Sequence, residues 1–118
     1  LLRIWKLPEE VRAAADLTSL RRVVSSSASL PDWLQREWIE WIGPERVWEA
    51  YGGSERIGGT LISGTEWLKK PGSVGCATEG RKLRVLDPEL NKLGPGEIGD
   101  VYFMPPGGPG STYHYLGA

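Results

Sequence analysis

The sequence has very little of two residue types that often carry chemistry. Among its 118 residues there is one cysteine, Cys76, and one histidine, His114. A disulfide within the chain and a cysteine-based zinc site are therefore excluded. A single cysteine suits a reducing compartment, so we expect a cytoplasmic protein. The lone histidine is expected at the surface or in a loop rather than in catalysis.

The net charge is close to zero, and long apolar runs are absent. The 14 basic and 15 acidic residues leave a formal charge of −1. Without a broad positive field, nucleic acid is not an expected partner. No apolar run approaches the roughly 20 residues that cross a bilayer, so no membrane span is expected. An apolar share of 40% and a charged share of 25% are typical of a globular chain.

The chain also lacks an initiating methionine, and it starts at Leu1 and stops at Ala118. We expect both ends to be cuts inside a longer protein. What is plentiful is glycine (16) and proline (9), concentrated after residue 43. This distribution predicts a helical first third followed by turn-rich β structure.

Two short segments with β-branched or aromatic residues flank a helical pattern in the first half. They cover residues 19–25 and 46–50, and each predicts a strand. Two strands joined by a helix are most simply parallel. Ligands of parallel sheets bind beyond the carboxyl ends of the strands, which here are residues 25–29 and 51–55.

The clearest helix is predicted over residues 30–42, with Ser29 as its N-terminal cap and Gly43 at its end. Gln35 is expected to lie off the buried stripe. That stripe recurs at helical spacing and is expected in the core: Leu34, Trp38, Trp41 and Ile42. A shorter helix is expected over residues 7–15.

The second half predicts short antiparallel strands over residues 81–87 and 99–104, separated by turns rich in glycine and proline. The expected fold class is therefore mixed α/β. It comprises the strand–helix–strand end of a parallel-sheet subdomain, followed by a small distorted antiparallel β-barrel.

The segment after the second predicted strand carries the parts that a nucleotide and its metal need. An aromatic ring can stack on a base, and glycines let a ligand approach the backbone. A hydroxyl can contact a phosphate, and a carboxylate suits magnesium. These parts occur in the order Tyr51, Gly52, Gly53, Ser54 and Glu55. Taken alone, the pentapeptide also fits an ordinary glycine turn with a surface glutamate.

Further segments accompany this motif in a fixed order: residues 25–31, 47–55, 71–75, 84–87 and 94–101. Together they resemble the acyl-CoA synthetase branch of the adenylate-forming (AMP-binding) superfamily, over nearly the whole chain. The tryptophan-rich helix and residues 64–67 and 112–118 are similar to the bile-acid-CoA ligase type. The resemblance implies that residues 1–66 end an α/β AMP-binding subdomain. It also implies that residues 67–118 belong to a β-barrel subdomain of the same large N-terminal domain.

The resemblance implies an ATP-dependent acid–CoA ligase, with ATP or AMP, Mg²⁺, coenzyme A and a small carboxylic acid as ligands; it leaves a homodimer open. Tyr51 would pack against adenine, Ser54 would contact the α-phosphate, and Glu55 would bind magnesium. Ser54 and Glu55 are the expected catalytic residues. The expected nucleotide-binding residues are Ser27, Ala28, Ser29, Glu49, Ala50, Tyr51, Gly52, Gly53 and Ser54.

This sequence departs from the family pattern in several places. Ser54 stands where threonine is usual and keeps the hydroxyl, while the serine run around Ser27 replaces a Gly/Ala-Ala-Pro pattern. The glycine-rich phosphate loop, the ribose-binding aspartate and the C-terminal catalytic lysine are not among these residues. The chain on its own is therefore expected to be inactive. The alternatives are a stand-alone ligand- or protein-binding α/β module and a degenerate synthetase used for protein contacts. The carboxylic acid stays open.

Overall fold

The computed structural model describes residues 1–114 and 116, so the ending segment 112–118 lies partly outside the described residues. The chain separates into two compact units. The first unit comprises Leu1–Ala50 and Ile62–Gly75, and the second comprises Tyr51–Leu61 and Cys76–Ala118. The predicted mixed α/β class is confirmed. The predicted boundary near residue 66 concerns a longer domain and stays a prediction.

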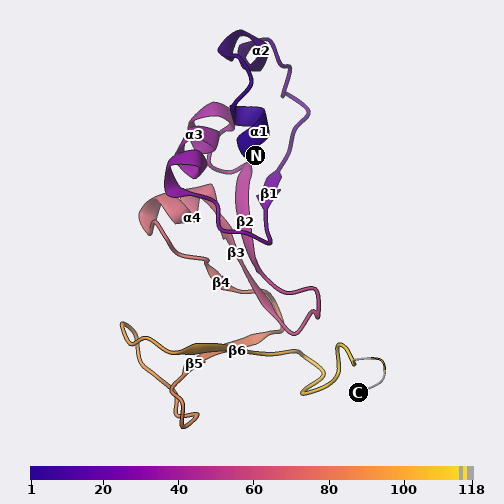
Figure 1. Cartoon of the computed structure of the whole chain (residues 1–118), viewed down its shortest axis with the longest axis vertical. Coiled ribbons are helices and arrows are strands. Elements are labelled where there is room, and N and C mark those ends of the chain that lie inside the picture. The colour runs from indigo at the N-terminus through magenta and orange to yellow at the C-terminus, as the bar shows by residue number, and fades with distance from the viewer. Residues whose placement is uncertain (115, 117–118) are drawn as a thin grey trace. The chain divides into compact units, whose positions relative to one another are not determined.

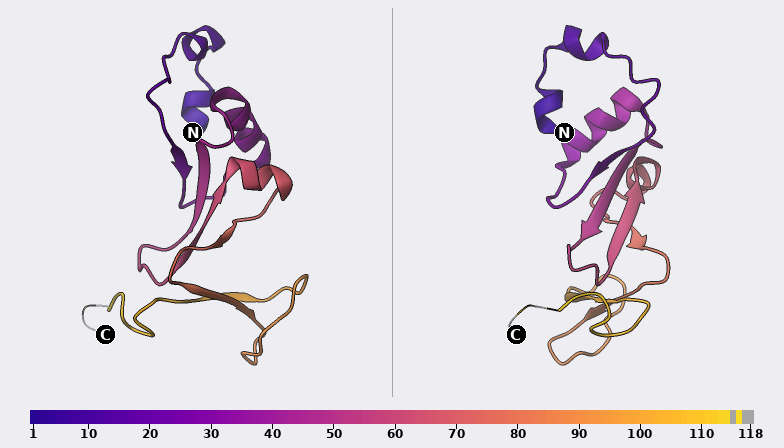
Figure 2. Two further views of the ribbon diagram at one scale, coloured as in Figure 1. Left: turned by 180° about the vertical axis from the view of Figure 1, so that it is seen from behind. Right: turned by 90° about the vertical axis from the view of Figure 1, so that its right-hand side faces the viewer.

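A strand–helix–strand segment forms the centre of the first unit, as predicted. It consists of β1 (Val23–Ser25), α3 (Asp32–Ile42) and β2 (Val47–Gly52). β1 and β2 pair in parallel, with Ser25 opposite Glu49 at the end of the ladder. Figures 1 and 2 show the two strands side by side with α3 alongside them. The parallel arrangement brings the segments that follow both strands to the same edge.

Helix α3 starts two residues later than predicted, and the predicted cap at Ser29 is wrong. The N-cap position belongs to Pro31, whose φ of −57° and ψ of 138° leave it just outside the helix. No side chain donates or accepts a capping hydrogen bond there. The helix ends where predicted, at Gly43, whose φ of 93° is a left-handed conformation that glycine adopts without strain.

The hydrophobic core lies between α3 and the strands of the first unit. Its buried apolar residues are Leu30, Leu34, Trp38, Ile39, Ile42, Val47, Ile62 and Trp67. Trp41 is only partly buried and packs edge-on against Trp5, with ring centroids 6.1 Å apart. The prediction for Gln35 is wrong, because its side chain is fully buried. The buried face of α3 is wide enough to include the position between Leu34 and Trp38.

Several short elements complete the sheet and its surroundings. The first unit also contains α1 (Leu2–Trp5), α2 (Glu9–Ala13) and α4 (Gly64–Lys69). Strands β3 (Gly59–Ser63) and β4 (Cys76–Ala77) pair antiparallel and extend the sheet to the order β1-β2-β3-β4. The sequence reading did not predict β3, β4, α1 or α4.

The second predicted strand pair is present as β5 (Lys82–Leu86) and β6 (Asp100–Met104), paired antiparallel over all five residues. The described residues form no closed barrel, because these two strands make a separate two-stranded sheet that cannot close on itself. None of the helices in the described part of the chain has the length and apolar character that a membrane crossing requires.

Candidate functional site

In the first unit, residues 25–29 form a turn at the end of β1, here called the serine turn. Glu49 of β2 lies beside both ends of this turn. Ser25 is the register partner of Glu49, so the turn starts beside that residue. At the other end of the turn, the backbone N–H of Leu30 donates to Oε1 of Glu49 at 3.4 Å. Ser27 has a left-handed φ of 71°, and the predicted contact residues Ser27, Ala28 and Ser29 are all exposed. Glu49 and Ala50 are half-buried next to this turn in the strand pair.

In the second unit, the end of β2 leads directly into a tight turn. The backbone N–H of Arg56 donates to the carbonyl of Gly53 at 3.2 Å, which places Ser54 and Glu55 at the two central positions. Arg56 itself has a φ of 58°. The hydroxyl of Ser54 and the carboxylate of Glu55 are thus carried by a turn, and Ser54 is exposed while Glu55 is half-buried.

Protein atoms approach both glycines of this segment closely. A Cβ built at Gly52 would lie 2.8 Å from the carbonyl oxygen of Gly58, which is backbone and cannot rotate away. A Cβ at Gly53 would lie 2.5 Å from Oε2 of Glu55, so the carboxylate folds back over a residue without a side chain. Gly52 is therefore needed so that the Gly58 backbone can pass beside it, whereas at Gly53 the flexible carboxylate of Glu55 could move aside.

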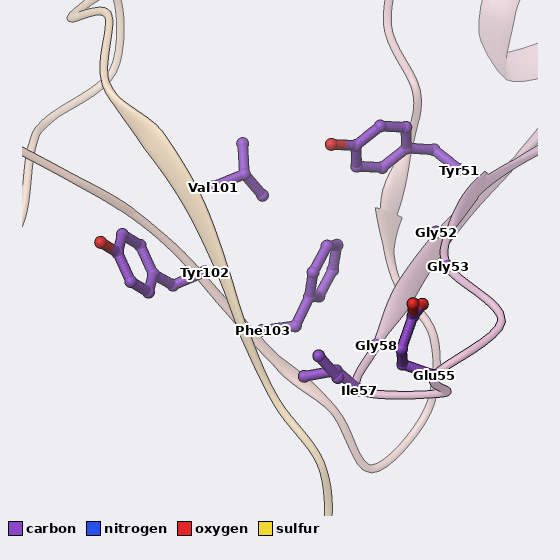
Figure 3. Close-up of a pocket in the computed structure, with 9 residues that line it drawn as sticks. All are labelled: Tyr51, Gly52, Gly53, Glu55, Ile57, Gly58, Val101, Tyr102 and Phe103. Atoms are coloured by element: carbon purple, nitrogen blue, oxygen red, sulfur yellow. The ribbon is translucent and has the colours of Figure 1, made fainter. Parts of the chain in front are cut away.

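A cavity of about 450 Å³ opens beside this turn within the second unit. Its lining includes Tyr51, whose side chain is 47% exposed, and Glu55. Figure 3 shows the rings of Tyr51 and Phe103 and the carboxylate of Glu55 around the same space. The complete lining is Tyr51, Gly52, Gly53, Glu55, Ile57, Gly58, Val101, Tyr102 and Phe103. Apolar walls with one carboxylate suit a flat organic group that carries a charged or metal-bound end.

The structure brings the predicted site residues together in two groups. Ser27, Ala28, Ser29, Glu49 and Ala50 belong to the first unit, and the five residues from Tyr51 to Glu55 belong to the second. The sequence reading missed Ile57, Gly58 and Phe103 as neighbours of Tyr51. The adjacent glycines 58 and 59 were a local signal of close packing, whereas Phe103 gave no local signal because its contact depends on a distant strand.

Comparison with known proteins identifies the family of the chain. The family model of the AMP-binding enzymes matches residues 2–115, almost the entire chain. The chain belongs to the AMP-binding enzyme family. The resemblance of the ordered motifs to this superfamily is therefore confirmed.

Individual members of the family are recognisable relatives. This AMP-binding chain is 27% identical over 111 residues to 4-coumarate–CoA ligase-like 3 of Arabidopsis thaliana, a match covering 92% of the chain and 20% of that protein. It is 32% identical over 96 residues to p-hydroxybenzoic acid–AMP ligase FadD22 of Mycobacterium marinum, a match covering 80% of the chain and 13% of that protein.

A solved structure shows the same fold. The anthranilate CoA ligase AuaEII in complex with anthranoyl-AMP matches with a TM-score of 0.63 and 30% identity. The match covers 83% of this chain and 18% of that one. The AMP-binding chain described here thus spans a fifth or less of each of these three proteins.

Proposed function

We propose that the protein containing this chain activates a carboxylic acid with ATP and passes the acyl group to coenzyme A. In the first step a carboxylate oxygen attacks the α-phosphate of ATP. The acyl-adenylate forms, and the bond to pyrophosphate breaks. In the second step the CoA thiol loses its proton and attacks the acyl carbon, which forms a thioester and releases AMP. Membership of the AMP-binding family supports the use of ATP in this proposal.

One observation carries the proposal: the exposed ring of Tyr51 near the end of β2, followed in the next turn by the exposed hydroxyl of Ser54 and the half-buried carboxylate of Glu55. In the proposed roles, Tyr51 packs against adenine and Ser54 donates to an α-phosphate oxygen. Gly52 and Gly53 border the carboxylate and acyl group. Since charge builds on the phosphoryl group, positioning and electrostatic stabilisation should supply most of the rate enhancement.

The serine turn suits the adenine end of the nucleotide. Ser27, Ala28 and Ser29 would line the adenine slot largely through their backbone. An ionised Glu49 is an acceptor only, so it matches the exocyclic amino group of adenine, which donates. One of its oxygens already accepts from the N–H of Leu30, and this bond holds the carboxylate at the end of the turn. Ala50 would contribute backbone beside it.

A magnesium ion fits Glu55 with help from the substrate. Within the described residues, no group of three or more His, Cys, Asp or Glu side chains gathers to hold a metal. Magnesium is commonly bound by one or two carboxylates together with substrate phosphates and water, so a single glutamate is a sufficient protein ligand. When bound, the ion would neutralise developing phosphate charge.

The proposal also includes the molecule that accepts the acyl group and the class of carboxylic acid that is activated. The names of two relatives, 4-coumarate–CoA ligase-like 3 and anthranilate CoA ligase AuaEII, support coenzyme A and aromatic acids. The name of FadD22, an acid–AMP ligase, favours a second candidate function in which the acyl-adenylate is the product. The bile-acid-like assignment, the cytoplasmic location and a homodimer stay predictions.

Exchange of pyrophosphate into ATP by the full-length protein tests the first step, with a panel of aromatic, fatty and sterol side-chain acids. Glu55→Gln should lower acid-dependent exchange by about 100-fold or more, because a charge-stabilising ligand is lost. The matched control is Glu79→Gln, which changes an exposed glutamate of the same unit. Full exchange activity in Glu55→Gln would refute the metal role. Thioester formation on adding CoA separates the ligase from the acid–AMP alternative.

A further inference from the structure

Phe103 lies beside the ring of Tyr51, although the two residues are 52 positions apart in the sequence. Both residues belong to the second unit. Their ring centroids are 6.3 Å apart, and the ring planes are inclined by 39°. This distance lies within the range of favourable aromatic pairs. Figure 3 shows both rings facing the same space, with Phe103 projecting from β6 toward the motif.

The position of the Phe103 side chain is set by a glycine. A Cβ built at Gly58 would overlap the Phe103 side chain at its Cβ and the near edge of its ring. The Phe103 ring therefore packs directly against the backbone of Gly58, which has no side chain. That backbone is itself held next to the motif, since the carbonyl of Gly58 approaches Gly52 too closely to admit a side chain there. Gly52, Gly58 and Phe103 thus form a close-packed contact beneath Tyr51.

The contact between Phe103 and Tyr51 matters because the Tyr51 side chain is otherwise largely exposed to solvent. Its side chain is 47% exposed, while Phe103 is half-buried in the same cavity wall. An exposed aromatic side chain has rotational freedom that is lost when a base stacks on it. A neighbouring ring that restricts the rotation reduces this loss and keeps the stacking face in place.

We propose that Phe103 is a positioning residue, which sets the orientation of the Tyr51 ring and thereby the affinity for the adenine base of ATP. The proposal rests on the function proposed above. It adds a residue outside the motif, from a strand later in the chain. Phe103 acts through Tyr51, so its effect depends on the presence of that ring.

The test uses the full-length protein and measures KM for ATP and kcat in acid-dependent pyrophosphate exchange. Phe103→Ala should raise KM for ATP about fivefold to tenfold with little change in kcat, because base stacking is weakened. It should also reduce the preference for ATP over CTP, whose smaller base stacks less well. Phe103→Tyr should keep the wild-type KM, since the ring is retained and the atoms nearest Gly58 are Cβ, Cγ and Cδ1, which tyrosine shares.

Two further variants make the test specific. Gly58→Ala should resemble Phe103→Ala, because the new Cβ displaces the ring. Leu83→Ala is the matched control: Leu83 is the cross-strand partner of Phe103 and is also half-buried, but it does not line the cavity. It should leave KM for ATP unchanged even if it lowers the unfolding temperature.

A double variant decides whether Phe103 acts through Tyr51. In a Tyr51→Ala background, Phe103→Ala should raise KM for ATP no further. Independent, multiplicative effects would overturn the proposal, as would an unchanged KM in Phe103→Ala or an equal rise in Leu83→Ala. Wild-type protein without acid-dependent exchange would overturn the proposed function itself, and this proposal with it. Wild-type exchange with unaffected variants refutes only the role of Phe103.

Discussion

Among the residues that the structure describes, the eight buried apolar residues of the hydrophobic core all belong to the first unit and none to the second. In the second unit, the segment from Tyr51 to Ser54 is exposed, and close approaches of backbone at glycines shape the loop. Burial of apolar surface is the main source of stability, while exposed loops on a rigid support commonly carry function. The difference suggests that stability and activity can be changed separately in this chain.

The largest stability effect is expected from a change in the core of the first unit. Trp38→Ala removes a large side chain that is only 3% exposed, and it should destabilise the protein by about 3–5 kcal/mol. Thermal unfolding of the full-length protein measures the effect. Trp33→Ala is the matched control, since Trp33 lies on the same helix and is 51% exposed. Equal losses from both variants would contradict the placement of the core.

Gly52→Ala changes the second unit, and it should lower exchange activity more than stability, the opposite of Trp38→Ala. The added Cβ would lie 2.8 Å from a backbone oxygen, so the loop must shift at a cost of about 1–3 kcal/mol. Pyrophosphate exchange should fall much more than in the folded fraction of Trp38→Ala, because Tyr51 and Glu55 move with the loop. Gly94→Ala is the control, since its added Cβ would meet only the side chain of Glu97. Full exchange in Gly52→Ala would remove the distinction between the units.

A smaller effect is expected at the start of α4. Ser63 accepts from the backbone N–H of Glu66, and Glu66 accepts from the backbone N–H of Ser63, which forms a capping box. Ser63→Ala should therefore destabilise the protein by about 1 kcal/mol. The change appears as a lower unfolding temperature with unaltered exchange activity. Thr65→Ala, at an exposed position of the same helix, should change neither quantity.

The smallest effect is a dependence of stability on pH at the same cap. The backbone and hydroxyl groups of Ser63 donate to the carboxylate of Glu66 and lower the pKa of Glu66 below its ordinary value of 4.5. The unfolded chain therefore binds this proton at a higher pH than the folded chain. The contribution is complete above pH 4.5 and is lost as the pH falls through the lowered pKa.

Unfolding measured from neutral to acidic pH checks this expectation. Glu66→Gln should flatten the decline of stability below the ordinary pKa of the carboxyl group, because it removes the ionisable group. Ser63→Ala should flatten the decline only in part, because it removes the hydroxyl donor and keeps the backbone N–H that also donates to Glu66. An unchanged decline in both variants would show that the capping box does not contribute to the acid sensitivity.

Local patterns in the sequence were sufficient for several parts of the fold and of the candidate site. The helix ending at Gly43, the two parallel strands and the pair β5 and β6 all follow from periodicity, β-branched residues and glycine or proline signals. Glu55 follows β2 as predicted, whereas Tyr51 lies inside the strand, because β2 extends to Gly52 and does not end at residue 50.

The three-dimensional packing decided the remainder. Gln35 is polar, yet it is buried because the covered face of α3 is wider than the apolar stripe. Strand β4 has only two residues, too few to show alternation, and it is defined by its pairing with Thr60 and Leu61 of β3. The seat of Phe103 on Gly58 depends on two segments far apart in the chain. Local preferences therefore set which residues present chemistry, and non-local packing sets which neighbours orient them.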